Sequence, residues 1–326
     1  MNSGDDVTDS EDFIIETREL VKIFPGNVKA VDGLSIKVKR GEVFGFLGPN
    51  GAGKTTSIKM MVGLLRPTKG NTIIDGLEIK AGSKVVREKV GVCPQDITIW
   101  DQLTTYENLQ MIGELYEVKK SRVEENIDWL LESLKLQEKR KSLAKDLSGG
   151  MKRRLNLAMA LVHDPEIIVL DEPSPGLDPQ SRLVLWDFIA SIPKKGDKTV
   201  ILTTHFMEEA DRLSNTVAII DHGKLLVEDA PARLKSSIGE GDVLELSFEE
   251  GADLKASAAD FGNREDVLSA NVAGGRVVIR VKDAMCKLPE LFEFVKDHGS
   301  EVKDVRYRGN TLEDVFISLT GRGLRE

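Results

Sequence analysis

Cysteine and long hydrophobic runs are what this chain of 326 residues most conspicuously lacks. Its two cysteines, Cys93 and Cys286, lie far apart and fit no metal-ligand spacing, so we predict two free thiols in a reducing compartment. The nearest candidate for a membrane span, residues 58–65, contains Lys59 and is far shorter than the roughly 18 apolar residues that a span needs. We therefore expect a cytoplasmic protein that reaches a membrane only by docking onto a separate chain that spans it.

An excess of positive charge is also missing, since the formal net charge is −9 and the sequence pI is near 5.2. A protein that binds nucleic acid needs a basic surface to contact the phosphates, so the charge argues against a nucleic-acid partner. Residues 1–12 contain no Lys or Arg and contribute Asp5, Asp6, Asp9, Glu11 and Asp12. We expect these residues to form a solvated, disordered tail; a functional acidic arm is the alternative.

What the chain does have is a glycine-rich loop between an expected buried strand, residues 42–47, and an expected helix. The spacing Gly-x-x-x-x-Gly-Lys-Thr lets backbone N–H groups surround phosphate oxygens at a helix N-terminus. We expect Lys54 to reach the β- and γ-phosphates and Thr55 to ligate Mg²⁺. An ordinary glycine-rich turn is the alternative. The predicted nucleotide-binding positions of the loop are Gly48, Pro49, Asn50, Gly51, Ala52, Gly53, Lys54, Thr55 and Thr56.

A second candidate site element is the hydrophobic strand at residues 167–170, which ends in Asp171 and Glu172. A carboxylate at the end of such a strand is suited to hold Mg²⁺, and we assign this role to Asp171. We expect Glu172 to act as the general base that polarises the attacking water. A pair of solvated carboxylates in a turn is the alternative.

Residues 147–151 read Leu-Ser-Gly-Gly-Met, between the phosphate loop and the Asp171–Glu172 strand end. In this order the three motifs resemble the ATP-binding-cassette (ABC) ATPases, whose signature is LSGGQ. Ser148 is typical of a helix N-cap, which makes the start of the following helix an anion site. The resemblance implies that Ser148, Gly149 and Gly150 bind the ATP held by a second copy of the chain. It also implies that Asp178 crosses the interface of a head-to-tail homodimer with two composite sites.

The same resemblance implies roles for three further residues. Gln95 matches the glutamine that senses Mg²⁺ and the attacking water and that touches the transport partner. His205 matches the switch histidine that contacts the γ-phosphate. Phe24 matches the aromatic residue that stacks on adenine, although tyrosine is commoner there and a plain core Phe is the alternative. The predicted catalytic residues are Lys54, Gln95, Glu172 and His205, and the predicted Mg²⁺ ligands are Thr55, Gln95 and Asp171.

The hydrophobic pattern predicts an α/β fold with a parallel sheet and covering helices. The helix after the phosphate loop should present Ile58, Met61, Val62 and Leu65 on one face and end at Arg66. The resemblance adds an antiparallel β subdomain and a helical subdomain over about 96–163, with Leu109, Leu115 and Leu130 among its core candidates. The expected cassette covers 13–235. Residues 240–326 should form a small α+β domain, in a ferredoxin-like arrangement, whose helices bury Phe292 and Leu319.

Several residues resemble those of ABC-2-type exporters, including drug-export ATPases. These are Met151 with the following Lys152, Arg153 and Arg154, and the Thr-Leu-Glu-Asp-Val-Phe segment at 311–316. We therefore predict an ATP-hydrolysing subunit, peripheral on the cytoplasmic face of the membrane, that powers a separate integral membrane permease. Ser174 and Pro175 depart from the usual family sequence before Asp178, and Pro175 should stiffen that loop.

Other functions were weighed against this prediction. A soluble ABC ATPase that acts on ribosomes or DNA is the main alternative, disfavoured by the single cassette and by the acidic pI. A non-catalytic nucleotide sensor is disfavoured by Glu172 and His205. A guanine-reading Asn-Lys-x-Asp segment is missing, which argues against a GTPase. The role of the C-terminal domain stays open between packing on the cassette or its dimer mate and regulation by a bound ligand.

Overall fold

The computed structural model describes residues 13–80, 82–194, 198–237, 241–249, 252–297 and 301–321. The predicted acidic tail at 1–12 lies outside these residues. The chain forms two compact units that meet in sequence after Pro231, slightly before the predicted cassette end at residue 235. Among the described residues, no helix is both long and apolar enough to cross a membrane.

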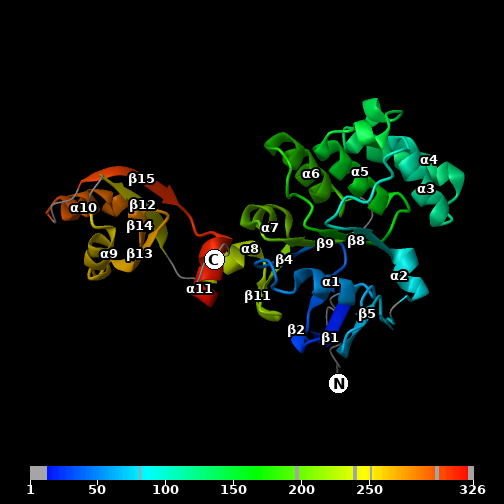
Figure 1. The fold of residues 1–326 in the computed structure, drawn as a ribbon. Coiled ribbons are helices and arrows are strands. Elements are labelled where there is room, and N and C mark those ends of the chain that lie inside the picture. Colours follow the sequence, from blue (N-terminus) through cyan, green and yellow to red (C-terminus); the bar gives the residue numbers. More distant parts are fainter. Residues whose placement is uncertain are drawn as a thin grey trace, which may run out of the picture. The chain divides into compact units, whose positions relative to one another are not determined.

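The centre of the first unit is a six-stranded sheet with the order β11-β10-β4-β9-β8-β7. Five strands run parallel and β11 is antiparallel to β10 (Figure 1). Ile168 and Leu170 face a core cluster with α5 and α6, whereas Ile167 and Val169 face a second cluster with α1. Strands buried on both faces read as continuous apolar runs, which explains the sequence of this sheet. The strands are β4 (Val43–Leu47), β7 (Val90–Cys93), β8 (Ile167–Asp171), β9 (Thr199–Thr204), β10 (Thr216–Asp221) and β11 (Lys224–Asp229).

An antiparallel sheet covers the α1 side of this core, in the order β2-β1-β5-β6 with β3 beside β1. Its longest strand, β1, has 12 residues. The strands are β1 (Phe13–Phe24), β2 (Val28–Leu34), β3 (Lys37–Lys39), β5 (Lys69–Ile74) and β6 (Leu77–Glu78).

The segment between β7 and β8 is helical, as predicted, and Thr104 and Glu107 form a reciprocal capping box at the start of α3. One core prediction is wrong here, because Leu115 is 72% exposed at the end of α3. The helix after the phosphate loop ends at Met61 rather than Arg66, since Gly63 takes a left-handed φ of 68°. The helices are α1 (Lys54–Met61), α2 (Lys84–Lys89), α3 (Thr105–Leu115), α4 (Lys120–Ser133), η1 (Gln137–Lys139), η2 (Ala144–Asp146), α5 (Gly149–Leu161), α6 (Pro179–Ser191), α7 (Met207–Leu213) and α8 (Pro231–Ser237).

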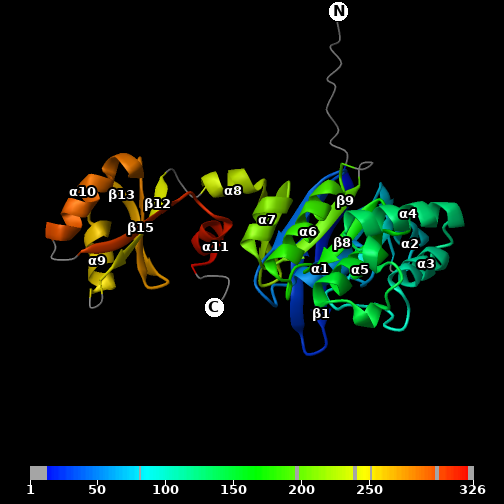
Figure 2. The same cartoon turned by 90° about the horizontal axis from the view of Figure 1, so that it is seen from above.

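The second unit contains a four-stranded antiparallel sheet with the order β13-β14-β12-β15. This order is that of the split βαβ arrangement, so the ferredoxin-like prediction matches the structure (Figure 2). One face packs on α9 and α10. Phe292 and Leu319, predicted to be buried, are exposed. The elements are β12 (Asp242–Phe248), α9 (Leu254–Gly262), β13 (Val267–Ala273), β14 (Arg276–Val281), α10 (Ala284–Asp297), β15 (Val302–Arg308) and α11 (Leu312–Thr320).

Candidate functional site

The phosphate loop connects β4 to α1, and its backbone excludes side chains at two glycines. A Cβ on Gly53 would lie 2.3 Å from the Ala30 carbonyl oxygen, and the φ of Gly53 is +100°. A Cβ on Gly48 would lie 2.2 Å from the Ile220 carbonyl oxygen. The loop therefore keeps its shape only with glycine at both positions, and its N–H groups are left free of neighbouring Cβ atoms.

Lys54 begins α1 and is 5% exposed. Its ammonium donates to the carbonyl oxygens of Gly48 (2.8 Å) and Pro49 (3.0 Å) and lies 3.5 Å from Glu172 Oε1. Burial lowers the pKa of Lys54, while Glu172 and then Asp171 oppose that shift. The ammonium is thus held inside the loop, where an anionic phosphate would strengthen its charged form.

Asp171 ends β8 beside the start of α1. Its Oδ1 accepts hydrogen bonds from Thr55 Oγ1 at 3.0 Å and from Thr203 Oγ1, on β9, at 2.6 Å. Three elements that are distant in sequence thus converge on one carboxylate oxygen. Two of the predicted metal ligands, Thr55 and Asp171, are brought into direct contact.

Glu172 lies at the centre of the cluster and is 8% exposed. Its Oε1 lies 3.4 Å from His205 Nδ1, and its Oε2 accepts from Gln95 Nε2 at 3.3 Å. The residue has a φ of +46°, a conformation that is unfavourable for a side chain with a Cβ. Two hydrogen bonds from its backbone N–H to Thr203 hold it there, to the carbonyl oxygen at 3.1 Å and to Oγ1 at 3.0 Å. All four predicted catalytic residues therefore meet at one carboxylate.

Arg153 is a site residue whose role the sequence did not reveal. From α5 its buried guanidinium donates to the carbonyl oxygens of five residues, Pro94, Gln95, Asp171, Glu172 and Pro173, at 2.5–3.1 Å. It thereby joins the helix that Ser148 starts to both catalytic loops. The sequence spacing offered a signal that Arg153 is buried, because Arg153 lies on the same helical face as the buried Leu157 and Ala160.

Glu209 on α7 forms a second buried group that sequence reasoning missed. Its Oε1 accepts from Ser174 Oγ and from Trp186 Nε1, the latter at 2.9 Å. Glu209 is completely buried, and burial raises the pKa of its carboxyl group against the hydrogen bonds from Ser174, Thr204 and Trp186. Ser174, noted in the sequence only as a departure, thus ties the loop before Asp178 to the helix that follows His205.

Comparison with known proteins agrees with this geometry. Residues 31–175 match the family model described as ABC transporter. The chain is 36% identical over 313 residues to a Cupriavidus metallidurans protein named Nod factor export ATP-binding protein I, covering 96% of this chain and 99% of that protein. A protein of the same name from Paraburkholderia xenovorans is 38% identical, with 94% and 97% covered.

The chain belongs to the ABC transporter ATP-binding proteins.

A solved structure supports this assignment for the first unit. That of cbiO1 from Clostridium perfringens, described as part of the ABC transporter complex cbiONQ, has a TM-score of 0.64 at 26% identity. It covers 69% of this chain and 91% of that one. The predictions of an ABC ATPase fold, of ATP binding and hydrolysis, and of a subunit of an ABC exporter are confirmed.

The signature of this ABC ATPase lies apart from the Glu172 cluster. Ser148 caps α5 as predicted, because its hydroxyl accepts from Met151 N at 3.3 Å. A Cβ on Gly150 would lie 2.4 Å from Ser181 Oγ and 3.6 Å from Asp178 Oδ2. Gly150 of the signature and Asp178 are therefore neighbours. In the part of the chain that the structure describes, no hydrogen bond or ion pair joins Ser148 to Lys54.

Asp178 and Phe24 each have a local structural contact that the family resemblance did not indicate. Asp178 caps α6, accepting from Ser181 N at 2.9 Å, and this hydrogen bonding lowers the pKa of Asp178. Phe24 ends β1 with its ring 37% exposed and with Lys22 Nζ 5.3 Å from the ring centroid. Its exposure favours the stacking prediction over a plain core Phe, since a core side chain would be covered.

Proposed function

We propose that this ABC ATPase hydrolyses ATP with Mg²⁺ at two composite sites of a homodimer and thereby drives a separate membrane permease of the ABC-2 export type. The observation that carries the proposal is the convergence of Lys54, Gln95 and His205 on the Glu172 carboxylate, at 3.3–3.5 Å. The neighbouring Asp171 accepts from Thr55 at 3.0 Å. The relatives named for export give the direction of transport.

Mg²⁺ fits the oxygen atoms that meet beside the phosphate loop. Thr55 Oγ1 and Asp171 Oδ1 lie 3.0 Å apart, and a hydroxyl with a carboxylate is the hard oxygen set that Mg²⁺ prefers. Gln95 would reach the ion through its side-chain oxygen while its Nε2 holds Glu172. The bound ion supplies charge neutralisation at the phosphates.

Glu172 is suited to take the proton of the attacking water. Gln95 and His205 flank its two oxygens, and both can orient a water molecule against the γ-phosphate. Lys54 lies on the phosphate side of the same carboxylate and neutralises the charge that moves toward the leaving group.

The start of α5, at the signature, supports the proposed homodimer because it offers a second phosphate-binding element. Ser148 opens a helix of 13 residues whose N-terminus can hold a phosphate. By the family resemblance, the nucleotide that this helix start serves is the one held by a second copy of the chain. Head-to-tail pairing gives two identical sites.

The proposed permease contact lies on the helical subdomain. The segment 97–116 contains five exposed large apolar side chains, namely Ile97, Trp100, Met111, Leu115 and Tyr116. Tyr116 stacks on His163, and both line a cavity of about 530 Å³ together with Leu115. An exposed apolar group of this kind is typical of a protein interface, and docking there would hold the subunit peripherally at the cytoplasmic face of a membrane.

Light scattering tests the composite site. We expect the molar mass of the Glu172→Gln variant to double when ATP and Mg²⁺ are added. The double variant that also carries Ser148→Arg should keep the mass of one chain and still bind ATP. Ser121→Arg, at an exposed position of α4, is the matched control and should double. The dimer would be contradicted if the Glu172→Gln variant kept the mass of one chain with ATP. It would also be contradicted if Ser148→Arg weakened the ATP affinity of the single chain.

Purification of the ATP-bound Glu172→Gln variant from its own membranes tests the partner. Recovery of a polytopic membrane protein supports the permease, whereas recovery of ribosomes or DNA-repair factors without one would favour the non-transport alternative. Replacing Leu115 with Glu should reduce recovery of the permease and leave ATP-driven doubling unchanged.

A further inference from the structure

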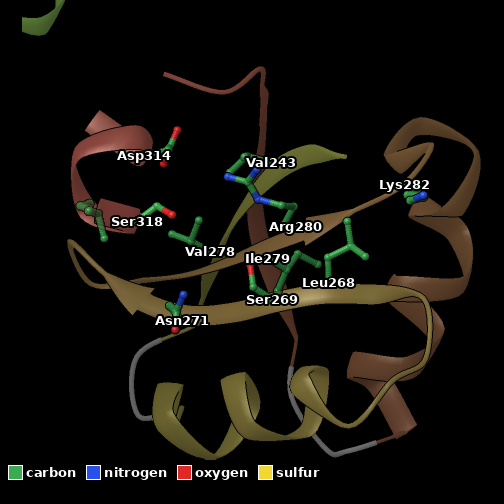
Figure 3. Close-up of a pocket in the computed structure, with 11 residues that line it drawn as sticks. Val243, Leu268, Ser269, Asn271, Val278, Ile279, Arg280, Lys282, Asp314 and Ser318 are labelled. Atoms are coloured by element: carbon green, nitrogen blue, oxygen red, sulfur yellow. The ribbon is translucent and has the colours of Figure 1, made fainter. Parts of the chain in front are cut away.

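A cavity of about 570 Å³ lies on the four-stranded sheet of the second unit, with β13 and β14 along its floor and Asp314 on α11 at one side (Figure 3). The three charged groups of its lining are already engaged. Asp314 accepts from Arg308 at 3.0 Å, and Arg280 and Lys282 also have interaction partners. None of the three is therefore free to hold a ligand. A buried polar side chain of the first unit, by contrast, places all of its hydrogen bonds on one catalytic loop.

This side chain is Asn156, which lies on α5 and is 2% exposed. Its Oδ1 accepts from the backbone N–H of Thr98 at 3.0 Å and from Thr98 Oγ1 at 3.1 Å. Its Nδ2 donates to Cys93 Sγ at 3.4 Å and to the carbonyl oxygens of Pro94 and Asp96 at 3.5 Å. The backbone N–H of Thr98 can only donate, so it fixes which way the amide of Asn156 points.

Gln95 lies in the middle of the loop that Asn156 holds. Arg153, one turn earlier on the same face of α5, donates to the Gln95 carbonyl oxygen at 2.7 Å. Asn156 binds the backbone on both sides of Gln95. Within the described residues, no other hydrogen bond or ion pair reaches residues 96–98. The course of the backbone after Gln95 therefore depends on the Asn156 amide.

The side chain of Gln95 is the catalytic part of this loop, since its Nε2 donates to Glu172 Oε2 at 3.3 Å. Residues 95–98 are exposed, so packing against neighbours contributes little to holding them. Their hydrogen bonds to buried groups of α5 have to fix the loop instead. Because a displacement of about 1 Å can lower a catalytic rate about a hundredfold, loss of these bonds should be visible in ATP turnover.

We propose that Asn156 is a positioning residue for ATP hydrolysis, which keeps the Gln95 side chain against the Glu172 carboxylate by holding Thr98 and the end of β7. The proposal rests on the proposed catalytic role of Gln95, and it names a residue of the signature helix on which that role depends. Asn156 acts through Gln95, because among the described residues it has no hydrogen bond to Glu172 or Lys54.

A double-mutant cycle on the full chain tests this dependence, with the rate of phosphate release from ATP and Mg²⁺ as the measurement. Asn156→Leu should lower kcat about tenfold or more and change the KM for ATP by less than about threefold, because the phosphate loop is untouched. Gln95→Ala should also lower kcat about tenfold or more. Adding Asn156→Leu to Gln95→Ala should lower kcat further by less than about twofold, because the side chain that Asn156 positions is then absent.

Asn126→Leu is the matched control. Asn126 on α4 is also buried, and its Nδ2 donates to the Val162 carbonyl oxygen at 2.9 Å, at the opposite end of α5 from the signature. Loss of a buried amide should destabilise this variant and Asn156→Leu to a similar extent. Asn126→Leu should nevertheless change kcat per folded molecule by less than about twofold, because its hydrogen bond is far from the catalytic loop in sequence and holds no part of it.

Hydrogen exchange in the unaltered protein gives a test that does not depend on the folding of any variant. The amide of Ile97 has no hydrogen-bond partner among the described residues, whereas the amide of Thr98 donates to Asn156. Nuclear magnetic resonance should therefore show the Thr98 amide exchanging at least about tenfold more slowly than the Ile97 amide.

Three results would overturn the positioning role alone. These are equal losses of kcat from Asn156→Leu with and without Gln95, an unchanged kcat per folded molecule in Asn156→Leu, and a Thr98 amide that exchanges as fast as that of Ile97. An unchanged kcat in Gln95→Ala by itself would contradict the catalytic role of Gln95 in the proposed function, and the positioning role would be overturned with it.

Discussion

The two units of this protein cover their sheets in different ways. The six-stranded sheet is buried on both faces, so its functional groups, including Asp171 and Glu172, follow the ends of strands. The four-stranded sheet packs one face on α9 and α10, and Arg280 and Val278 stand in mid-strand on the other face. A sheet that is buried on both faces can place functional groups only at the ends of its strands. A sheet that is buried on one face can also place them along the other face.

The largest effect that tests this contrast is loss of the strand-end carboxylate. Glu172→Gln should lower ATP turnover by about 10²–10⁴-fold, the usual effect of removing a general base. Glu245→Gln, at a mid-strand carboxylate that accepts from Arg276 and Arg308, should change turnover by less than about twofold, since it lies on the other sheet. The rate of phosphate release measures the ATP turnover of both variants. Comparable losses of ATP turnover in the two variants would contradict the distinction between the two sheets.

Each unit holds one cysteine, which gives a direct comparison of their environments. Cys93 is buried at the end of β7, and burial raises the pKa of its thiol to about 11, whereas Cys286 on α10 is exposed. The thiolate fraction of Cys93 is thereby lowered about a hundredfold before access is considered. Iodoacetamide should label one thiol per native chain, and mass spectrometry should place it on Cys286. Fast labelling of Cys93 would contradict the burial of this strand end.

Removal of the guanidinium that spans the catalytic loops should have the next largest effect. Arg153→Leu removes the guanidinium donor from five backbone carbonyl groups, which should lower the free energy of unfolding by about 3 kcal/mol and turnover by roughly tenfold or more. Arg153→Lys should recover part of both. Arg306→Leu, at an exposed position on β15, is the control. If Arg153→Leu loses stability but keeps its turnover per folded molecule, the residue has no part in positioning Glu172.

The smallest predicted effect is a pH-dependent difference between two mid-strand carboxylates. Burial, with Glu42 and Asp229 nearby, raises the pKa of Glu228 on β11 to about 7, whereas Arg308 and Arg276 lower the pKa of Glu245. Between about pH 4.5 and 7 folded Glu228 binds more protons than unfolded Glu228, so the free energy of unfolding falls as pH rises through this window. Glu228→Gln should therefore stabilise the protein at pH 8 by on the order of 1 kcal/mol and give no gain at pH 4.5.

Glu245→Gln should have the opposite sign, because its ion pairs stabilise the folded state above the unfolded carboxyl pKa and are lost in acid. Urea unfolding at the two pH values separates the variants. A gain in stability at pH 8 from Glu245→Gln, or none from Glu228→Gln, would contradict the assigned environments.

The sequence predicted those parts of the site whose chemistry depends on local spacing. The phosphate loop, the strand-end carboxylates and the Ser148 cap can each be recognised from a few consecutive residues. The structure places each of them in the expected element. The contacts of Arg153 and Ser174 could not be read in this way, because their acceptors lie on other segments of the chain. The prediction for Leu115 was wrong for a related reason, since helical periodicity alone cannot say which residues at the end of a helix the rest of the chain covers.

The left-handed backbone of Glu172 has a consequence for how this protein could be stabilised. A non-glycine residue at φ +46° costs about 1 kcal/mol or more, and Gly would relieve that cost. A search for thermostable variants that ignored turnover would therefore favour Gly at this position and discard the carboxylate that we propose as the general base. At residue 172, heat resistance and catalysis would be selected against each other, so a library screened for one must be scored for both.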